Sequence, residues 1–553
     1  MSDQAPGPGW WKASDGQWYP PQPPTAQQPP VYPPAAPQSP PTAQQPPVYP
    51  PGYEPQPQAY PPQPATYAPQ PPAGGGGGSK TGLIVLIGAL VVVAGIVVAL
   101  LAFGGSDDDD DDANGSASSA ASSTTVADDG RVRPVDGAAG VKVVGGTGDD
   151  GETVVVNAIV ELQRFWTATM PEVFGQEYQP VQGGFYSASP DEELPPCAQS
   201  SDDIAGNAFY CPSEDVVAWD DTGLVPKLRK EYDDLAVAVV MAHEWGHAVQ
   251  ARAGLTGATV TMEHQADCFA GAWVGHISNT EGSSFKVTAR SIDNALAGFL
   301  ELADTPGTAA TDATAHGSAF DRVNGFVDGV EGGAAKCATY RDDNVTLVEL
   351  PFTDQADLDR GGNLPYEGSA DLAIADLEDY WSKVAAEEGK TWTPLNPAEP
   401  FDGASGETPS CGDDDTSGFK LFYCAAGRFI AYDDTEVMPR VHEALGDFAT
   451  ATLLATQYGL AVLDQVGGIG NDPKAENLAA DCLAGSWAAS VFLGNRPDSG
   501  SLTLSPGDLD EAVKALLVFS SSVSDENPEQ GAGFERVDSF RSGVLGGVEA
   551  CSG

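Results

Sequence analysis

Basic residues are scarce in this chain of 553 residues. It has 26 lysines and arginines against 79 aspartates and glutamates, which gives a formal net charge of −53. Three acidic residues and two lysines leave residues 1–106 with a net charge of −1, so nearly all of the negative charge lies beyond them. A surface this acidic repels phosphate groups, and we therefore expect neither nucleic acid nor anionic lipid among its partners.

Cysteine is absent from the first 196 residues, and all eight cysteines lie in the acidic part of the chain. An even number of cysteines indicates disulfides outside the cytosol, whereas in the cytosol it would indicate thiols or metal ligands. Their interpretation therefore depends on which side of a membrane they lie. The eight are Cys197, Cys211, Cys268, Cys337, Cys411, Cys424, Cys482 and Cys551.

Residues 1–80 are rich in proline, glutamine and tyrosine, a composition that cannot bury a core and predicts a disordered, extended region. The string PPTAQQPPVYPP occurs at residues 23–34 and again at 40–51. Such a segment is either a spacer or a ligand for an aromatic groove. A Trp-rich motif at residues 9–20 either forms a small hairpin or binds a partner.

Residues 83–103 form an uninterrupted apolar run of 21 residues, about the length of a transmembrane helix. The run lies too far from the N-terminus for a cleaved signal peptide. Lys80 precedes it, which predicts a single-pass plasma-membrane protein with a cytoplasmic N-terminus and an extracellular C-terminal part. Residues 104–150, acidic and rich in serine and glycine, are expected to form a flexible stalk.

Histidine is rare, with six residues in all, yet two of them stand four apart in the string His243-Glu244-Trp245-Gly246-His247. The apolar residues before the string and the glycine after it predict that it lies within a helix. Residues four apart share a helical face, so both imidazoles can bind one metal ion while Glu244 projects beside it. This is the HExxH arrangement of zinc peptidases, although a degenerate site could keep it only for packing.

A catalytic zinc site usually takes a third protein ligand from another element. Glu263 and Asp267, four residues apart on the next helical segment, face the same way, whereas Cys268 points elsewhere. We therefore expect Glu263 to be the third ligand. Asp267 is expected to orient a histidine ring by accepting its second N–H, and Cys268 is expected to be structural.

Three separated strings, HEWGHAVQ, EHQADCFAGAW and HGS followed by DRV, occur in order between residues 153 and 340. Together they resemble the bacterial neutral zinc metallopeptidase family, within the gluzincin class. The resemblance implies a zinc-dependent peptidase, a probable endopeptidase, that acts on protein or peptide substrates with Glu244 as the base. His264 departs from the family pattern, and a surface position is the favoured interpretation.

His316, in the HGS string, is one candidate for the donor that stabilises the oxyanion, and a histidine that packs or caps near a helix start is an equally open interpretation. Residues 216–221 are expected to form a strand that ends at the turn into the HExxH helix. By analogy with other zinc peptidases, an extended peptide would pair with such an edge strand.

The sequence after about residue 370 repeats the first module: Cys424, Trp487 and Cys551 have counterparts in Cys211, Trp273 and Cys337. The positions of the two histidines, the glutamate base and the third ligand hold other residues there. Such a set binds zinc poorly, so we expect an inactive copy. The four replacements are Thr456, Leu460, Gln457 and Asn477.

If both modules pair their cysteines internally and alike, three connectivities remain. We favour Cys197 with Cys211, Cys268 with Cys337, Cys411 with Cys424, and Cys482 with Cys551.

The expected architecture is α+β and mainly helical. Two tandem zincin-like modules, residues 151–345 and 370–553, stand behind a single transmembrane helix and a disordered N-terminus. The predicted function is a membrane-anchored zinc peptidase outside the cytoplasm. A rival interpretation is a non-catalytic protein whose modules bind a cell-wall or other envelope partner.

Overall fold

The computed structural model describes residues 11–12, 18–19, 132–308, 315–348, 350–466, 472–493, 502–520 and 530–551. The chain divides into two units, Met1–Gly78 and Ser79–Gly553. The apolar run at residues 83–103 and the expected stalk up to residue 131 lie outside the described residues. Among the helices that the structure describes, none has both the length and the apolar character needed to cross a membrane.

In the first unit, β1 (Trp11–Lys12) pairs with β2 (Trp18–Tyr19) in antiparallel register. Trp11 lies opposite Tyr19, and Lys12 lies opposite Trp18. The Trp-rich motif therefore contains a strand pair, as the hairpin interpretation predicts.

The second unit begins with a mixed four-stranded sheet, in the order β3-β4-β6-β5. Parallel pairing joins β3, β4 and β6, while β5 runs antiparallel at the edge beside β6. The expected edge strand, β6, is thus an inner strand, and β5 is the edge strand. The bounds are β3 (Val143–Val144), β4 (Gly184–Ala188), β5 (Ala208–Cys211) and β6 (Val216–Asp220).

Ordered structure starts earlier than the predicted stalk boundary at residue 150. Val132 is buried, the N–H of Val135 donates to Asn157 (3.0 Å), and β3 lies within the expected stalk. Residues 132–149 therefore belong to the folded part. A short 3₁₀ helix there is η1 (Ala138–Gly140), and a second, η2 (Ser201–Asp203), follows β4.

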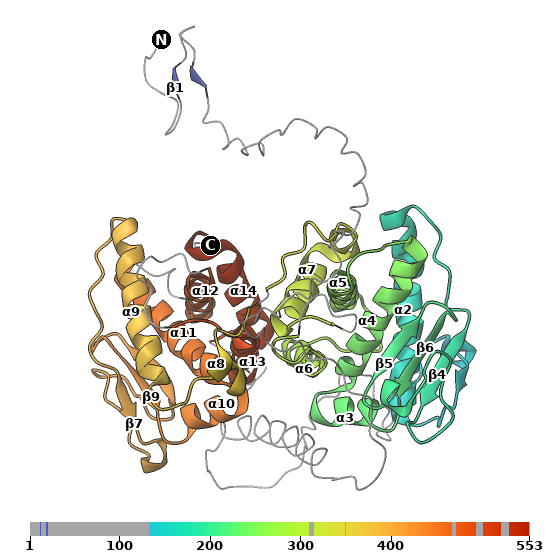
Figure 1. Cartoon of the computed structure of the whole chain (residues 1–553), viewed down its shortest axis with the longest axis horizontal. Coiled ribbons are helices and arrows are strands. Elements are labelled where there is room, and N and C mark those ends of the chain that lie inside the picture. The colour runs from blue at the N-terminus through green and yellow to red at the C-terminus, as the bar shows by residue number, and fades with distance from the viewer. Residues whose placement is uncertain are drawn as a thin grey trace, which may run out of the picture. The chain divides into compact units, whose positions relative to one another are not determined.

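Helices pack against this sheet and form most of residues 132–348, here called the first half (Figure 1). Asp233 caps α4 by accepting the N–H groups of Leu235 (2.8 Å) and Ala236 (3.1 Å), and Gly254 ends that helix with φ of 67°. The helices are α2 (Asp150–Phe174), α3 (Leu224–Glu231), α4 (Asp234–Ala253), α5 (Thr259–Ser278), α6 (Ala289–Leu300) and α7 (Ala319–Cys337).

Residues 350–551, the second half, contain a smaller sheet of order β7-β9-β8 and a similar series of helices. The strands are β7 (Glu399–Phe401), β8 (Leu421–Cys424) and β9 (Phe429–Asp433), and the short helices are α8 (Gln355–Asp359) and η3 (Gly403–Ser405). The longer helices are α9 (Ser369–Glu387), α10 (Val437–Leu445), α11 (Asp447–Val466), α12 (Pro473–Phe492), α13 (Asp508–Ser520) and α14 (Gly533–Ala550).

The two halves match element by element from α2 and α9 onward. In both, an antiparallel pair (β5 with β6, β8 with β9) precedes a short helix and then four long ones. The last helix of each half is kinked at a glycine with positive φ, Gly333 (63°) or Gly547 (66°). The four disulfides have the expected pairing: Cys197–Cys211, Cys268–Cys337, Cys411–Cys424 and Cys482–Cys551.

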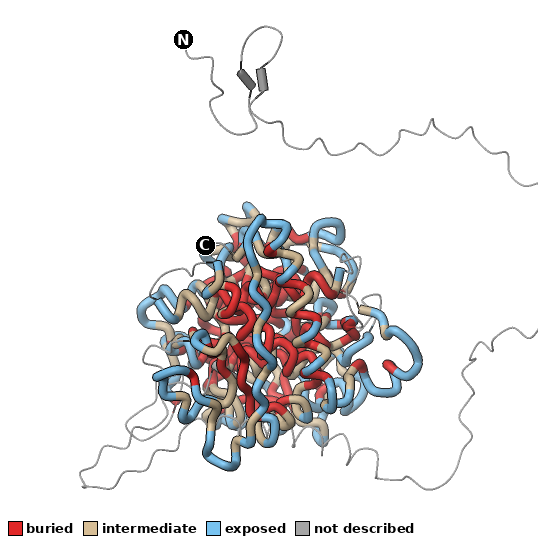
Figure 2. Tube along the Cα trace, turned by 90° about the vertical axis from the view of Figure 1, so that its left-hand side faces the viewer, coloured by how far each residue is buried: buried red, intermediate tan, exposed pale blue. Residues whose placement is uncertain are grey.

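The buried residues of both halves form a largely continuous apolar core, which is red in Figure 2. Two aspartates, one from each half, cap a helix of the other half. Asp293 in α6 accepts the N–H groups of Gly533 (2.8 Å) and Phe534 (2.7 Å) at the start of α14. Asp510 in α13 accepts the N–H of Phe320 (2.9 Å) at the start of α7. The halves therefore contact each other through equivalent helices.

Candidate metal centre

Helices α4 and α5 approach each other closely at Gly246. A Cβ atom at this position would lie 2.7 Å from the Cα of Ala266, so a larger residue would push the helices apart. His243 and His247 lie on either side of Gly246 along α4, and Glu263 lies almost one turn before Ala266 on α5. The glycine therefore allows the backbone approach that brings the three side chains together.

The predicted ligand atoms converge on one point. The Nε2 atoms of His243 and His247 are 3.2 Å apart. Glu263 places Oε2 3.2 Å from Nε2 of His243 and Oε1 3.4 Å from Nε2 of His247. His243 is buried, while the side chains of His247 and Glu263 are 20% and 14% exposed, so the cluster is open to solvent on one side.

Other side chains hold both imidazoles by their second ring nitrogen. His243 Nδ1 lies 2.7 Å from Oδ1 of Asp267, which also accepts a hydrogen bond from Arg322 (3.1 Å). His247 Nδ1 lies 2.9 Å from Oε1 of Gln250. An N–H at Nδ1 leaves the lone pair of Nε2 directed at the cluster, which is the tautomer that a metal ligand requires.

Glu244 projects from the same helix and lies near the edge strand. Its Oε2 accepts the backbone N–H of Tyr210 in β5 at 2.8 Å. Burial raises the pKa of the Glu244 carboxyl above its ordinary value. The side chain is thus held at one oxygen, and its affinity for a proton is increased.

The charges of the cluster strongly favour a cation. Burial disfavours the imidazolium of His243, but the carboxylates of Asp267, Glu263 and Glu244 outweigh burial and raise the pKa of His243 to about 10. Burial also acts against the charged form of Glu263, yet the two histidines hold the pKa of that carboxyl well below its usual range. Positive charge is therefore stabilised where the three side chains meet.

The arrangement fits a zinc ion. Two imidazole nitrogens and one carboxylate oxygen form a familiar catalytic zinc set, which leaves a fourth position for water. Their ligand atoms all lie within 4.8 Å of one another. Glu263 Oε2 is buried and has no partner with hydrogen-bond geometry among the described residues, as expected of an atom whose partner is a metal ion.

Two of the histidines lie elsewhere than the sequence interpretation placed them. His316 is exposed, and its contacts are with Asp304, which lies 3.3 Å from Nδ1 and accepts the backbone N–H of His316 at 2.7 Å. The structure does not bring it to the cluster, which favours the packing interpretation over the role of oxyanion donor. His264 is buried, not on the surface: its ring lies against Tyr340 (5.3 Å between centroids), and burial lowers its pKa to about 4.

Three contributors to the site were not expected from the sequence: Gln250, Arg322 and the backbone N–H of Tyr210. Gln250 stands three residues after His247, on the same helical face, so its spacing carried a usable signal. Arg322 belongs to the DRV string, but nothing in that string identifies Asp267 as its partner. A backbone group such as the N–H of Tyr210 leaves no trace in the sequence.

The corresponding positions of the second half hold no such cluster. The hydroxyl of Thr456 donates to the carbonyl of Leu453 in its own helix (2.8 Å), and the amide of Asn477 donates to the carbonyl of Pro473 (2.9 Å). Asp481, the counterpart of Asp267, makes two bonds to Arg536 (2.8 and 2.9 Å).

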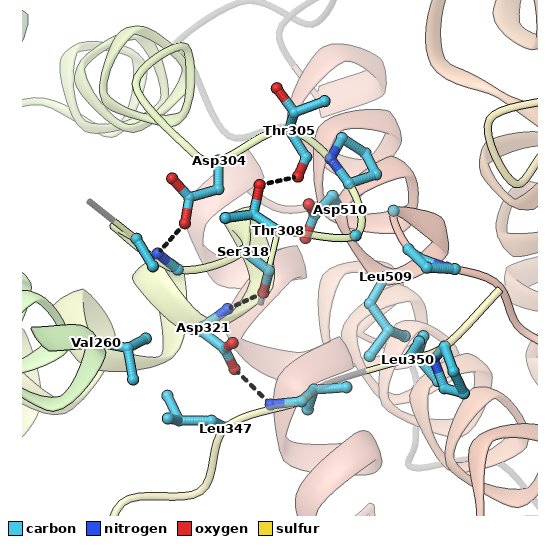
Figure 3. Close-up of a pocket in the computed structure, with 18 residues that line it drawn as sticks. Val260, Asp304, Thr305, Thr308, Ser318, Asp321, Leu347, Leu350, Leu509 and Asp510 are labelled. Carbon is cyan, nitrogen blue, oxygen red and sulfur yellow. Dashed lines mark hydrogen bonds between the residues drawn. The ribbon is translucent and has the colours of Figure 1, made fainter. Parts of the chain in front are cut away.

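A separate pocket of about 380 Å³ lies between the halves (Figure 3). Its walls come from the segments around Asp304 and Ser318, from residues 347–351 without residue 349, and from Pro506 to Asp510. None of the three candidate ligands lines it, so we attach the chemistry to the cluster and not to this pocket.

Comparison with known proteins agrees with the site. Residues 66–340 match the model of a family described as "Putative neutral zinc metallopeptidase". An uncharacterized protein of Mycobacterium tuberculosis is 32% identical over 172 residues, which cover 26% of this chain and 58% of the relative. The uncharacterized protein YpfJ of Escherichia coli is 30% identical over 160 residues, which cover 24% and 53%. The chain therefore spans little more than half of these relatives. No solved structure matches it.

Proposed function

We propose that the first half is a zinc-dependent peptidase that hydrolyses peptide bonds in proteins or peptides. The convergence of His243, His247 and Glu263, with Glu244 on the same helix, is the observation that carries this proposal. The description of the matched family agrees with it.

A zinc ion held by these three residues would polarise the scissile carbonyl and lower the pKa of a bound water. Glu244 is the general base: the N–H of Tyr210 holds Oε2, which leaves Oε1 to take the proton from the water. Because burial raises its pKa, the protonated Glu244 is stable long enough to pass that proton to the nitrogen of the leaving amine. Asp267 and Gln250 keep both imidazoles in the required tautomer.

We further propose that an extended substrate pairs with β5. Antiparallel strands direct alternate residues toward and away from their partner. The N–H of Tyr210 points away from β6, to Glu244, so the open edge of β5 faces the base. A peptide paired with this edge would lie beside the cluster.

The second half is proposed to be a duplicated copy that has lost catalysis. Its elements follow the same order, its cysteines pair alike, and its Asp481–Arg536 pair matches Asp267–Arg322. Its four replaced positions offer no metal-ligand set comparable to the first cluster.

The membrane-anchored, extracytoplasmic location also stays a proposal. It is supported by the apolar run at residues 83–103 and by the absence of free cysteines in the described part, where all eight are paired. Disulfides persist mainly in oxidising compartments.

Glu244→Gln tests the enzymatic proposal. In the purified full chain it should lower peptidase activity by a factor of about 100 or more, because the base is removed, while the zinc content stays near one per chain. Gln457→Ala, at the matching position of the second half, is the control and should leave both values unchanged. Full activity in Glu244→Gln, or a chain that takes up no zinc, would contradict the proposal and favour the non-catalytic binding protein.

A further inference from the structure

Three carboxylates meet inside the second half, away from the zinc cluster. Asp447 is the first residue of α11, and Asp508 and Glu511 lie in the first turn of α13. One oxygen of each lies within 4.8 Å of the others. The three residues are only 8%, 3% and 8% exposed, so their charges are shielded from water.

Two oxygens of this carboxylate triad have no partner. Oδ1 of Asp447 and Oδ1 of Asp508 are buried and accept no hydrogen bond from the described residues. In the same part of the chain, no lysine, arginine or histidine forms an ion pair with any of the three. Buried charges are normally paired or bound to a metal, so the triad requires a counter-charge.

The first half shows how the same place is neutralised there. Asp234, like Asp447, is the first residue of its helix, and Arg229 donates to it at 2.6 Å. In the second half His442 takes the place of Arg229 and is directed at the carbonyl of Leu364 instead (2.7 Å). The arginine has thus been lost opposite Asp447.

The other two carboxylates are additions. Asp293 and Asp510 occupy matching positions, because each caps the last helix of the opposite half. This match places Ser291 and Asn294 of the first half where the second has Asp508 and Glu511. One neutralised carboxylate has therefore been exchanged for three that lack an arginine.

Helix capping explains part of this change but not all of it. Glu511 accepts the N–H of Phe448 (2.9 Å), the bond that Asp233 makes to Leu235 in the first half. Gly446 stands at the place of Asp233, and a Cβ there would lie 2.0 Å from Cδ of Glu511. Capping accounts for Glu511, but it gives no reason to bury Asp447 and Asp508 beside it.

We propose that Asp447, Asp508 and Glu511 bind one calcium ion. Hard divalent cations take oxygen ligands, and calcium binds them at about 2.3–2.6 Å, so oxygens on one ion lie up to about 5 Å apart. The spacing of the triad agrees with this limit. An all-carboxylate set without nitrogen or sulfur favours calcium over zinc, and water or backbone oxygens complete the shell.

The ion would join the start of α11 to the start of α13. Asp508 also accepts the N–H of Ser505 (2.7 Å), which ties the preceding segment to the same point. Two residues after Asp508, Asp510 caps α7 of the first half. Calcium therefore fixes the helix through which the second half contacts the first.

Calcium titration of the full chain tests the proposal. The protein is stripped of metal, reloaded with one equivalent of zinc and titrated with calcium chloride, while bound calcium and the thermal unfolding midpoint are measured. The native chain should bind about one calcium per chain and unfold at a higher temperature when calcium is present. Asp508→Asn keeps the hydrogen bond from Ser505 and removes one charge, and it should bind calcium at least about tenfold more weakly.

Asp510→Asn is the matched control, because it removes the same charge from the same helix outside the triad. It should retain calcium uptake. Without calcium, Asp508→Asn should be at least as stable as the native chain, because repulsion within the triad is relieved. A purely structural role for Asp508 predicts the opposite, a loss of stability with and without calcium.

Equal calcium binding by the native chain and Asp508→Asn would overturn the proposal, as would a native chain that binds no calcium. If Asp508→Asn does not fold, Glu511→Gln serves instead, since its amide oxygen can still accept the N–H of Phe448. Loss of calcium from this variant alone supports the triad, and unchanged uptake refutes it.

Discussion

The two halves use one conserved pair of residues in different ways. In the first half, Asp267 accepts bonds from Arg322 and from His243, so it links the framework to the metal cluster. In the second half, Asp481 gives both of its oxygens to Arg536. The ion pair is therefore part of the framework, and the histidine is what adds chemistry to it.

Close helix packing is common to both halves as well. A Cβ at Gly246 would lie 2.7 Å from the Cα of Ala266, and one at Gly459 would lie 2.7 Å from the Cα of Ala480. The backbone approach that assembles the ligands thus exists where no ligands remain. Packing preserves the fold, while the metal set depends on a few side chains that can change without disturbing it.

The largest effect should come from breaking the shared ion pair. Arg322→Met and Arg536→Met each leave a buried aspartate without its guanidinium, and each should lower the free energy of unfolding by about 3–5 kcal/mol. Only Arg322→Met should also weaken zinc binding, by a factor of about 10–100. Denaturant unfolding and zinc competition measure the two effects. Equal loss of zinc from both variants would mean that general instability, and not the orientation of His243, is responsible.

Gln250→Leu should convert one contact of the first half into that of the second, where Leu463 stands at the same position. His247 loses the acceptor at its Nδ1, so zinc affinity should fall by about 10–100-fold while the midpoint of unfolding of the zinc-free chain changes little. The reverse change, Leu463→Gln, is the control and should not alter zinc content. Unchanged affinity in Gln250→Leu would remove Gln250 from the site.

A smaller difference should appear in the pH dependence of stability. Burial raises the pKa of Asp233 to about 6 from 3.8, whereas its counterpart Gly446 cannot titrate. The folded chain therefore binds more protons than the unfolded chain between these values, and the free energy of unfolding contributed by Asp233 falls as pH rises through them.

Asparagine also caps helices but does not titrate. Asp233→Asn should therefore gain stability relative to the native chain from about pH 4 to pH 6, with no further gain above pH 7. Thermal unfolding across this range measures the difference. A constant difference at all pH values would show that Asp233 does not have the raised pKa.

Local spacing explains which parts of the site could be predicted. His243, Glu244 and His247 are close because a helix places residues four apart on one face, and Glu263 and Asp267 follow the same rule. The pairing of the cysteines could be narrowed because the two halves constrain each other. Gln250 also obeyed the spacing rule and could have been found by it.

Contacts between distant segments explain what was missed. His264 follows Glu263 directly, but its burial depends on α7, where Gly325 leaves room for its ring. His316 belongs to a plausible motif, yet the segment that carries it bonds to Asp304 and stays on the surface. The order of the sheet made β5 the edge strand, which no property of residues 216–221 could reveal.

The sequence by itself determined the helix that carries HExxH, the candidate ligands and the mainly helical class, because helical periodicity is a property of neighbouring residues. Only the tertiary structure decided that Tyr210 holds Glu244, that Arg322 supports Asp267, and that Asp447 meets two carboxylates from a helix some 60 residues later. These contacts arise where helices and strands far apart in the chain pack together, and their geometry is set by the fold as a whole.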